Sequence, residues 1–273
     1  MDSQQQKNST HAKATVVIMT YNRKNTIVRA IKSVLDQTLK EWKLLILDDG
    51  STDGTDIIVK PFVLGDQRIM YYQLPTNKGI CHVLNQALNI VDTPYMVQLD
   101  SDDWLENNAL ETLVKGMENA PSSVALAYGN HKEWYNRNKG TIKKQRSFTP
   151  TDKYELLVYR STFYPRCYKT NYLKAVGGWE TNDKYNGRYM EDNRMFYKLI
   201  EKYDFHWIDE HMYNLNRYDG ERQTKPENSS KYAEIKKEFI QYYLKKWGNE
   251  YTADFSINKY GWLETKLKPN QKQ

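Results

Sequence analysis

The sequence predicts an α/β protein with a single, mostly parallel central sheet flanked by helices. Short apolar runs of strand length, such as ATVVIMT at 14–20 and WKLLIL at 42–47, are typical of strands buried on both faces. Segments with apolar residues at helical spacing, such as 25–38 and 79–91, alternate with these runs. Strands that alternate with helices form parallel sheets with right-handed crossovers.

The remaining elements follow from the same two patterns. Three more strands, at 68–74, 94–99 and 123–128, and helices at 53–60 and 107–119 continue the alternation. The second half is less regular: we expect helices at 170–176, 191–202 and 227–247, a strand at 205–213, and a hairpin or loop at 131–146. We therefore expect a disordered tail at 1–12, one domain at 13–220 and a helical extension at 221–273.

Composition excludes several classes of protein. The 273 residues include 40 Lys and Arg against 34 Asp and Glu, so the net charge is +6. This balance is too even to require a nucleic-acid partner. Two cysteines form neither a disulfide framework nor a four-cysteine zinc site. The chain shows no apolar stretch of about 20 residues and no apolar segment at its start. We expect a soluble protein of the cytoplasm.

Polar side chains follow three of the predicted strands, where each strand ends. In open parallel sheets, ligands bind beyond the carboxyl ends of the strands. If these strands are neighbours, an aromatic ring and several carboxylates converge on one cleft, and a divalent cation such as Mg²⁺ or Mn²⁺ relieves their repulsion. The residues concerned are Thr20, Tyr21, Asn22, Asp48, Asp49, Asp100, Asp102 and Asp103.

Two common nucleotide-binding motifs are absent from the sequence. It contains neither Gly-x-Gly nor GxxxxGK[ST]. A metal ion that bridges a diphosphate can replace a glycine-rich loop. The pattern therefore favours a sugar nucleotide over a hydride carrier or a phosphoryl donor.

Six motifs in a fixed order resemble those of the family 2 glycosyltransferases, across about residues 14–220. They are VVIMTYNR, LLILDDGSTDGT, NKGI, VQLDSDDW, VGGW and MEDNRMFYKL. The family has the GT-A fold, is inverting and metal-dependent, and includes bacterial spore-coat, capsule and O-antigen polysaccharide enzymes. The resemblance implies a hexosyltransferase with a nucleotide-binding half at 13–103 and an acceptor half at 104–220.

The resemblance also implies a role for individual residues. Asp192 would be the general base. Asp102 and Asp103 would bind the metal, although Asp103 is equally suited to cap the next helix. Uracil and thymine both present the imide that Asp49 would bind, so UDP or dTDP is preferred. The donor-binding residues would be Thr20, Tyr21, Asn22, Asp49, Lys78, Gly79, Asp100 and Ser101, and the acceptor and sugar pocket would comprise Gly178, Trp179 and Glu191.

The sequence departs from the family pattern at two places. Leu84 stands where many members have an arginine, so Lys78 supplies the positive charge or the donor is held differently. A Tyr-Arg-x-His stretch common in the family is missing, and Arg217 or Arg222 could replace its cation near the diphosphate.

Other functions stay open at this point. A sugar nucleotidyltransferase would use the same carboxylates, and a non-catalytic module that binds glycans or nucleic acid would use the basic stretch at 131–146. The leading interpretation gives the protein a nucleoside-diphosphate-sugar donor, a glycan or lipid-linked acceptor, and no nucleic acid. The helix at 227–247 is amphipathic, which suits a solvated face, a dimer, or peripheral contact with the inner face of a membrane.

Overall fold

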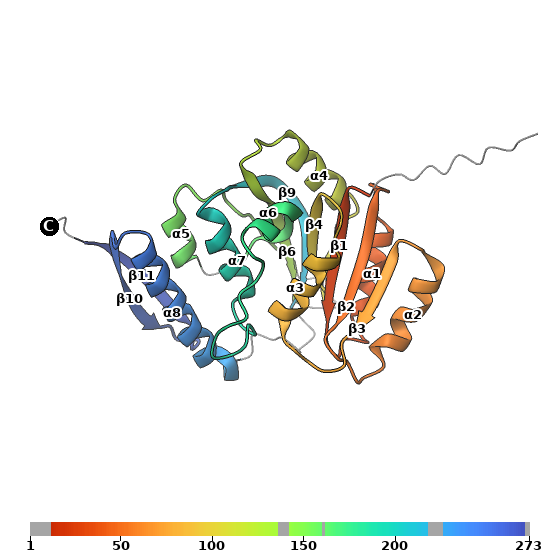
Figure 1. Cartoon of the computed structure of the whole chain (residues 1–273), viewed down its shortest axis with the longest axis horizontal. Helices are drawn as coiled ribbons and strands as arrows, with labels where there is room; N and C mark the ends of the chain where they lie inside the picture. Colours follow the sequence, from red (N-terminus) through yellow and green to blue (C-terminus); the bar gives the residue numbers. More distant parts are fainter. Residues whose placement is uncertain (1–11, 136–141, 160–161, 218–225, 271–273) are drawn as a thin grey trace, which may run out of the picture.

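The computed structural model describes residues 12–135, 142–159, 162–217 and 226–270. The predicted tail at 1–12 falls outside this part of the chain except for its last residue, and Arg222 lies outside it as well. The described residues form a central sheet with helices on both faces (Figure 1).

Nine strands of the described chain form one sheet in the order β3-β2-β1-β4-β8-β6-β9-β5, with β7 paired to β6. The strands are β1 (Ala14–Thr20), β2 (Trp42–Asp48), β3 (Ile69–Gln73), β4 (Tyr95–Asp100), β5 (Trp104–Leu105), β6 (Val124–Trp134), β7 (Ile142–Gln145), β8 (Tyr164–Lys169) and β9 (Asp204–Asn216). The predicted α/β fold is confirmed.

The first half of the sheet is parallel, as the sequence predicts. β1 pairs in parallel with β2 and β4, and β2 pairs in parallel with β3. Along β1, Val16 and Ile18 pack into one hydrophobic cluster while Val17 and Met19 pack into the other. Because β2, β1 and β4 are neighbours, the polar residues after these strands meet at one edge of the sheet.

Helices cover the two faces of the sheet through these two clusters. One face carries α1 (Ile27–Leu35), α2 (Thr55–Gly65) and α4 (Ala109–Asn119). The other carries α3 (Ile80–Ile90), α5 (Lys153–Val158), α6 (Thr170–Ala175), α7 (Glu191–Ile200) and α8 (Ser229–Lys246). In the described part of the chain, no helix is long and apolar enough to cross a membrane.

The second half of the sheet contains a strand that the sequence patterns did not predict. β8 lies between β4 and β6 and is antiparallel to both. It places Arg166 opposite Gln98 of β4, and both side chains are buried. The predicted hairpin at 131–146 is present in its described residues, where β6 and β7 pair in antiparallel fashion.

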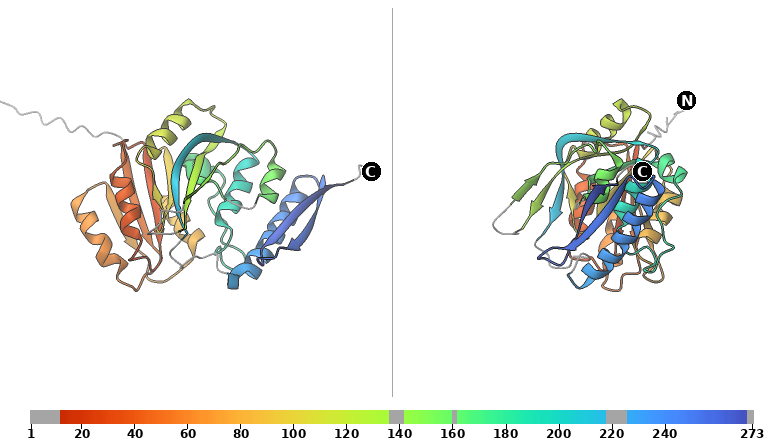
Figure 2. Two further views of the ribbon diagram at one scale, coloured as in Figure 1. Left: turned by 180° about the vertical axis from the view of Figure 1, so that it is seen from behind. Right: turned by 90° about the vertical axis from the view of Figure 1, so that its left-hand side faces the viewer.

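The C-terminal extension is a helix followed by a hairpin. α8 comes after a short 3₁₀ helix (Pro226–Asn228) and precedes the antiparallel pair β10 (Tyr251–Ile257) and β11 (Leu263–Pro269). We predicted the helix but not the hairpin. The extension packs against α7, where the rings of Tyr197 and Tyr243 lie 5.1 Å apart. Figure 2 shows it at the end of the molecule opposite β2 and β3.

Candidate functional site

A cavity of about 1420 Å³ opens beyond the carboxyl ends of β1, β2 and β4. Its wall includes residues from these strand ends, from the start of α7, from the end of β9, and from α8 and the C-terminal hairpin. Single-ligand pockets are commonly about 300–1,000 Å³. This cavity therefore has room for two substrates side by side.

Most of the predicted site residues line this cavity. Those on its wall are Thr20, Tyr21, Asn22, Asp49, Gly79, Asp100, Ser101, Asp102, Asp103, Glu191 and Asp192. Lys78, Gly178 and Trp179 are not on it.

The end of β1 offers an aromatic face and a hydroxyl to a ligand. Tyr21 lines the cavity with 41% of its surface exposed. The Thr20 hydroxyl is buried and has no hydrogen-bond partner among the described residues. Asn22 lines the wall as well, but its side-chain oxygen accepts a hydrogen bond from the Thr52 backbone at 2.9 Å. In this segment Tyr21 therefore offers an exposed ring, Thr20 offers a buried hydroxyl without a partner among the described residues, and Asn22 fixes the loop.

Asp49 organises the loop that faces β1 and β2. Its carboxylate accepts hydrogen bonds from the backbone nitrogens of Lys78 at 2.6 Å and Gly79 at 2.9 Å. Burial raises the pKa of Asp49, while these two bonds act in the opposite direction. The Asn-Lys-Gly motif thus contributes through its backbone, and the exposed Lys78 side chain is not where we predicted it.

The three aspartates after β4 form a crowded acidic edge. Burial raises the pKa of Asp102, and the neighbouring Asp100 raises it further. Burial also raises the pKa of Asp103 well above its usual value, and Asp102 and Asp100 add to this. Asp103 Oδ1 accepts the backbone N–H of Asn216 at 2.8 Å, so this residue braces the end of β9.

The described residues contain no group of three or more His, Cys, Asp or Glu side chains placed to hold a metal ion. The aspartates after β4 therefore do not form a site in which protein side chains alone complete the shell of a metal ion. The crowding at Asp100 and Asp102 instead fits a cation that takes one or two carboxylates and completes its shell with substrate phosphates.

A buried arginine connects this acidic edge to the predicted base. Arg166 is 1% exposed, and it donates hydrogen bonds from Nη1 to Asp192 Oδ2 at 2.6 Å and from Nη2 to Asp100 Oδ1 at 3.0 Å. Thr162 donates to the same Asp192 oxygen at 2.9 Å. The other oxygen, Oδ1, is buried and has no partner among the described residues. Asp192 thus has one fixed oxygen and one available to accept a proton.

The first turn of α7 holds two carboxyl groups, where the helix dipole favours negative charge. Burial raises the pKa of Asp192, and the Arg166 charge opposes this shift. Burial together with the charge of Asp192 raises the pKa of Glu191 to about 8. Two adjacent carboxyls with different environments are a frequent feature of acid–base sites.

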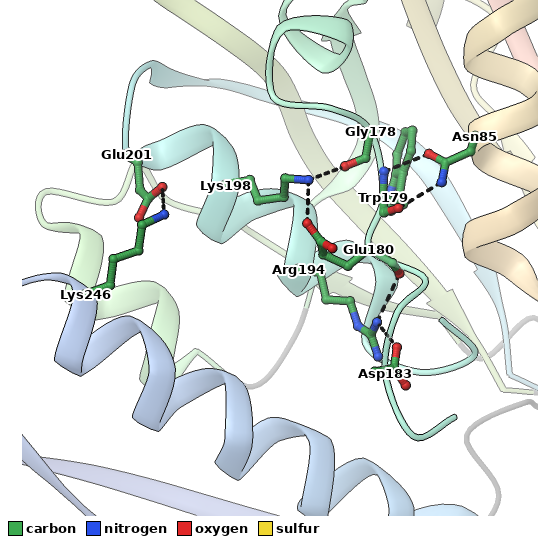
Figure 3. A network of polar contacts seen from close by, with 9 residues as sticks. All are labelled: Asn85, Gly178, Trp179, Glu180, Asp183, Arg194, Lys198, Glu201 and Lys246. Carbon is green, nitrogen blue, oxygen red and sulfur yellow. Dashed lines mark hydrogen bonds and ion pairs between the residues drawn. The ribbon is translucent and has the colours of Figure 1, made fainter. Parts of the chain in front are cut away.

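Gly178 and Trp179 pack inside the protein and do not line the cavity. Trp179 is 2% exposed and exchanges two backbone hydrogen bonds, each of 2.8 Å, with the Asn85 side chain of α3 (Figure 3). A Cβ atom on Gly178 would lie 2.4 Å from Asn85 Oδ1, and the φ angle of Gly178 is +66°. Only glycine allows this close approach. The motif therefore fixes α3 against the loop before α7, and our prediction of a sugar pocket there does not match the structure.

Sequence reasoning missed two cations at the site. Arg188 lines the cavity and donates to both the side chain and the backbone carbonyl of Asn77. Arg166 lies on the unpredicted strand β8. Each stands close in sequence to a recognised motif, but only the folded chain brings them to the carboxylates. Leu84, where many family members have an arginine, is buried in the core. Arg217 lines the cavity and pairs with Glu133 at 2.6 Å, so its proposed role near the diphosphate stays a prediction.

Comparison with known proteins agrees with this architecture. The curated glycosyltransferase GlyA of Streptococcus pneumoniae is 29% identical over 170 residues, which are 61% of this chain and 24% of that protein. The Escherichia coli enzyme WfgD, described as a UDP-Glc:alpha-D-GlcNAc-diphosphoundecaprenol beta-1,3-glucosyltransferase, is 34% identical over 116 residues, 42% of this chain and 44% of the enzyme. The chain thus spans about a quarter to under half of these two relatives.

A solved structure shows the same fold. The crystal structure of S. aureus TarS 1-349 in complex with UDP-GlcNAc superposes with a TM-score of 0.64 at 20% identity, covering 85% of this chain and 66% of TarS 1-349. This likeness confirms the GT-A-like fold. Residues 15–176 match the profile of the family described as "Glycosyl transferase family 2". Because this match extends over more than half of the chain, the protein belongs to glycosyl transferase family 2.

Proposed function

We propose that this chain is an inverting glycosyltransferase that moves a hexosyl group from a UDP- or dTDP-sugar to a hydroxyl of a glycan or lipid-linked saccharide. One observation carries the proposal. Asp192, a buried carboxylate with one free oxygen, lies in the same cavity as the strand-end residues suited to a nucleotide, and Arg166 connects the two regions. The family assignment and the UDP-sugars named for WfgD and TarS support this reading.

The donor nucleotide binds at the ends of β1 and β2. Its base stacks on Tyr21, which is half-exposed on the cavity wall, and the buried Thr20 hydroxyl and Asp49 offer it hydrogen bonds. Arg188 is held over Gly79 by hydrogen bonds to Asn77 and lies within electrostatic reach of Asp49, so its guanidinium is placed to meet the diphosphate of a base bound there. This arrangement replaces the cation that the family pattern has at the position of Leu84.

The carboxylates of Asp102 and Asp100 would hold a divalent cation, with Asp103 acting as a brace for β9. When bound, such a cation supplies positive charge that stabilises the leaving diphosphate. Ser101 and Gly79 line the same wall. Ser101 is almost fully buried, and the absence of a side chain at Gly79 leaves room for Arg188, whose Cγ would lie 2.9 Å from a Cβ atom there.

Asp192 removes the proton of the acceptor hydroxyl as that oxygen attacks the anomeric carbon. Oδ1 accepts the proton, while Arg166 and Thr162 hold Oδ2 and so fix the orientation of the carboxylate. Burial raises the pKa of Asp192 toward the working pH, which makes it a stronger base. A single displacement inverts the configuration of the sugar. A buried, oriented carboxylate with one oxygen available favours this reading over a nucleotidyltransferase or a binding module.

The acceptor approaches from the side of α7. WfgD is named for a diphosphoundecaprenol-linked sugar, and this name supports a lipid-linked saccharide as one acceptor class in bacterial polysaccharide synthesis. Glu191 lines the same part of the cavity, and its raised pKa keeps it protonated near neutral pH, so it can donate a hydrogen bond to the acceptor.

Calorimetric titration with UDP, dTDP, GDP, CDP and ADP, each with and without Mn²⁺, tests the donor site. We expect tighter binding of UDP or dTDP with Mn²⁺. Tyr21→Ala should weaken that binding about 5- to 150-fold, the usual worth of one stacked base. Tyr72→Ala is the matched control, because Tyr72 is 48% exposed on β3 and does not line the cavity. Preference for GDP, or equal losses in both variants, would contradict the proposed base site.

A further inference from the structure

The C-terminal extension completes one wall of the cavity. Tyr232 of α8 and Trp262 of the hairpin line it together with Tyr189, which precedes α7. The extension lies at the opposite end of the molecule from β2 and β3 (Figure 1), whereas Tyr21 and Asp49 follow β1 and β2. Tyr232 and Trp262 therefore come from a different part of the chain than the strand-end residues, in a cavity that exceeds the size needed for one ligand.

The three aromatic rings form a continuous surface. Tyr189 and Tyr232 have ring centroids 4.9 Å apart at 65°, and Tyr232 and Trp262 have centroids 6.0 Å apart at 74°. In an edge-to-face contact the edge of one ring covers only one face of the other. Tyr232 and Trp262 are both half-buried, so they retain accessible surface toward the cavity.

This surface lies beside the proposed base. Burial raises the pKa of Tyr232, and the charges of Glu191 and Asp192 raise it further. Tyr232 is thus within electrostatic reach of both carboxyl groups. Tyr232, Trp262 and Asp192 all line the same cavity, so a molecule bound there can contact the rings and the carboxylate together.

The aromatic wall is held rigidly. Asn258 Oδ1 accepts the backbone N–H groups of Tyr260 and Trp262 at 2.9 and 3.0 Å, which fixes the turn of the hairpin. The far end of α8 is fastened to α7, where the Trp247 ring nitrogen donates to Glu201 at 2.7 Å. Groups fixed in this way lose little conformational entropy when a ligand binds.

We propose that Trp262 and Tyr232 form a saccharide subsite, in which a pyranose ring of the acceptor stacks on the aromatic surface and presents its hydroxyl to Asp192. Trp and Tyr combine a flat apolar body with a polar group, which suits the apolar face and hydroxyl rim of a sugar ring. The inference rests on the proposed transferase activity and assigns to the extension the binding of the acceptor.

The test measures UDP release from UDP-glucose and UDP-N-acetylglucosamine with Mn²⁺, in the presence of a panel of methyl glycosides and disaccharides of hexoses and N-acetylhexosamines. For any saccharide that stimulates the wild-type protein, Trp262→Ala should raise the KM about tenfold or more, while the Kd for UDP stays the same. The KM of Trp262→Phe, which keeps a ring, should lie between those of the wild-type protein and Trp262→Ala.

Tyr260→Ala is the matched control. Tyr260 lies two residues away in the same turn, is 68% exposed and does not line the cavity, so it should leave the KM for the saccharide unchanged. An equal rise in KM for Tyr260→Ala and Trp262→Ala would mean that saccharide binding needs only an intact turn and no contact with Trp262. That result would overturn the subsite.

The remaining outcomes separate the two proposals. If the wild-type protein binds neither UDP nor dTDP with Mn²⁺ and turns over no sugar of either nucleotide, the proposed function fails. If it turns over the donor but no saccharide stimulates it, or if Trp262→Ala keeps the wild-type KM, the donor site stands and the saccharide subsite is refuted.

Discussion

The two sides of the cavity are built in different ways. On the donor side, Tyr21, Asp49 and Asp102 follow three neighbouring strands, and each belongs to a short sequence motif. On the acceptor side, Asp192 of α7 depends on Arg166 from β8, and the wall is completed by a helix and a hairpin that come much later in the chain, as at Trp262.

The difference shows where local patterns suffice. A parallel strand places the residues after it at a known edge of the sheet, so the donor side requires little information beyond the motif. The acceptor side requires antiparallel insertion of β8 and docking of α8, and neither leaves a short motif. Substitutions on the two sides should therefore affect different measurements.

The largest expected effect separates chemistry from donor binding. Asp192→Asn removes the base but preserves size and most hydrogen bonds, so kcat should fall about 10²- to 10⁴-fold. The Kd for UDP should stay near the wild-type value, because Asp192 lies on the acceptor side. Single-turnover kinetics and calorimetry measure the two quantities, and full transfer by this variant would remove Asp192 from the mechanism.

Loss of the arginine between the two sides should affect stability most. Arg166→Met leaves Asp100 and Asp192 without their shared counter-charge, which should lower the free energy of unfolding by about 3–5 kcal/mol at pH 7. Arg166→Lys keeps the positive charge but cannot donate to both carboxylates as the guanidinium does. The free energy of unfolding should therefore fall by less than in Arg166→Met.

Urea denaturation at pH 7 and pH 5 measures this loss. Because Arg166→Met removes the charge that opposes the raised pKa of Asp192, this carboxylate becomes easier to protonate and part of the lost stability should return at the lower pH. The same loss at both pH values would show that packing, and not charge, explains the role of Arg166.

A medium effect should come from the glycine that joins α3 to the loop before α7. Gly178→Ala places a Cβ atom 2.4 Å from Asn85 Oδ1 at a φ of +66°, which should cost about 1–3 kcal/mol of stability. Gly65→Ala is the control, since no atom lies within 4 Å of a Cβ there. Thermal unfolding compares them; a selective rise in KM with unchanged stability for Gly178→Ala would restore our original assignment of this residue to the sugar pocket.

The smallest expected effect concerns Glu191. Its pKa of about 8 in the folded protein exceeds the ordinary value of 4.5, so the stability it contributes is fully present below pH 4.5 and is lost as the pH rises through 8. Glu191→Gln cannot ionise and should escape this loss. Because Glu191 is half-buried and water screens it, we expect a relative gain on the order of 1 kcal/mol between pH 5 and pH 8.5, measured by urea denaturation. A constant difference between the two proteins would contradict the raised pKa.

The sequence predicted the parallel half of the fold because its signals are local. Three buried apolar runs, of which ATVVIMT is one, specify strands and the faces they bury. β8 escaped prediction because YPRCYK contains an arginine and a proline, which are unusual in a central strand. Here the arginine is tolerated because two carboxylates neutralise it.

In the candidate site, too, the residues that belong to short motifs could be predicted and those that depend on distant contacts could not. Asp192 and Asp102 were assigned from their motifs and lie on the cavity wall, although their roles stay predictions. Trp179 and Lys78 were placed wrongly because a motif states which residues recur but not which way each side chain points. Trp262 and Arg188 could not be identified, since their importance depends on which distant segments they meet.

The double contact of Arg166 has a consequence for how this protein can change over time. The effects of two substitutions at separate sites on the free energy of unfolding usually add. Asp100 and Asp192 share one partner, so replacing either changes how much the other contributes to stability. A neutral residue at one of the three positions leaves a charge imbalance that favours compensation at the other two. These positions are therefore expected to vary together among descendants of this sequence, as an epistatic unit that crosses the boundary between donor and acceptor halves.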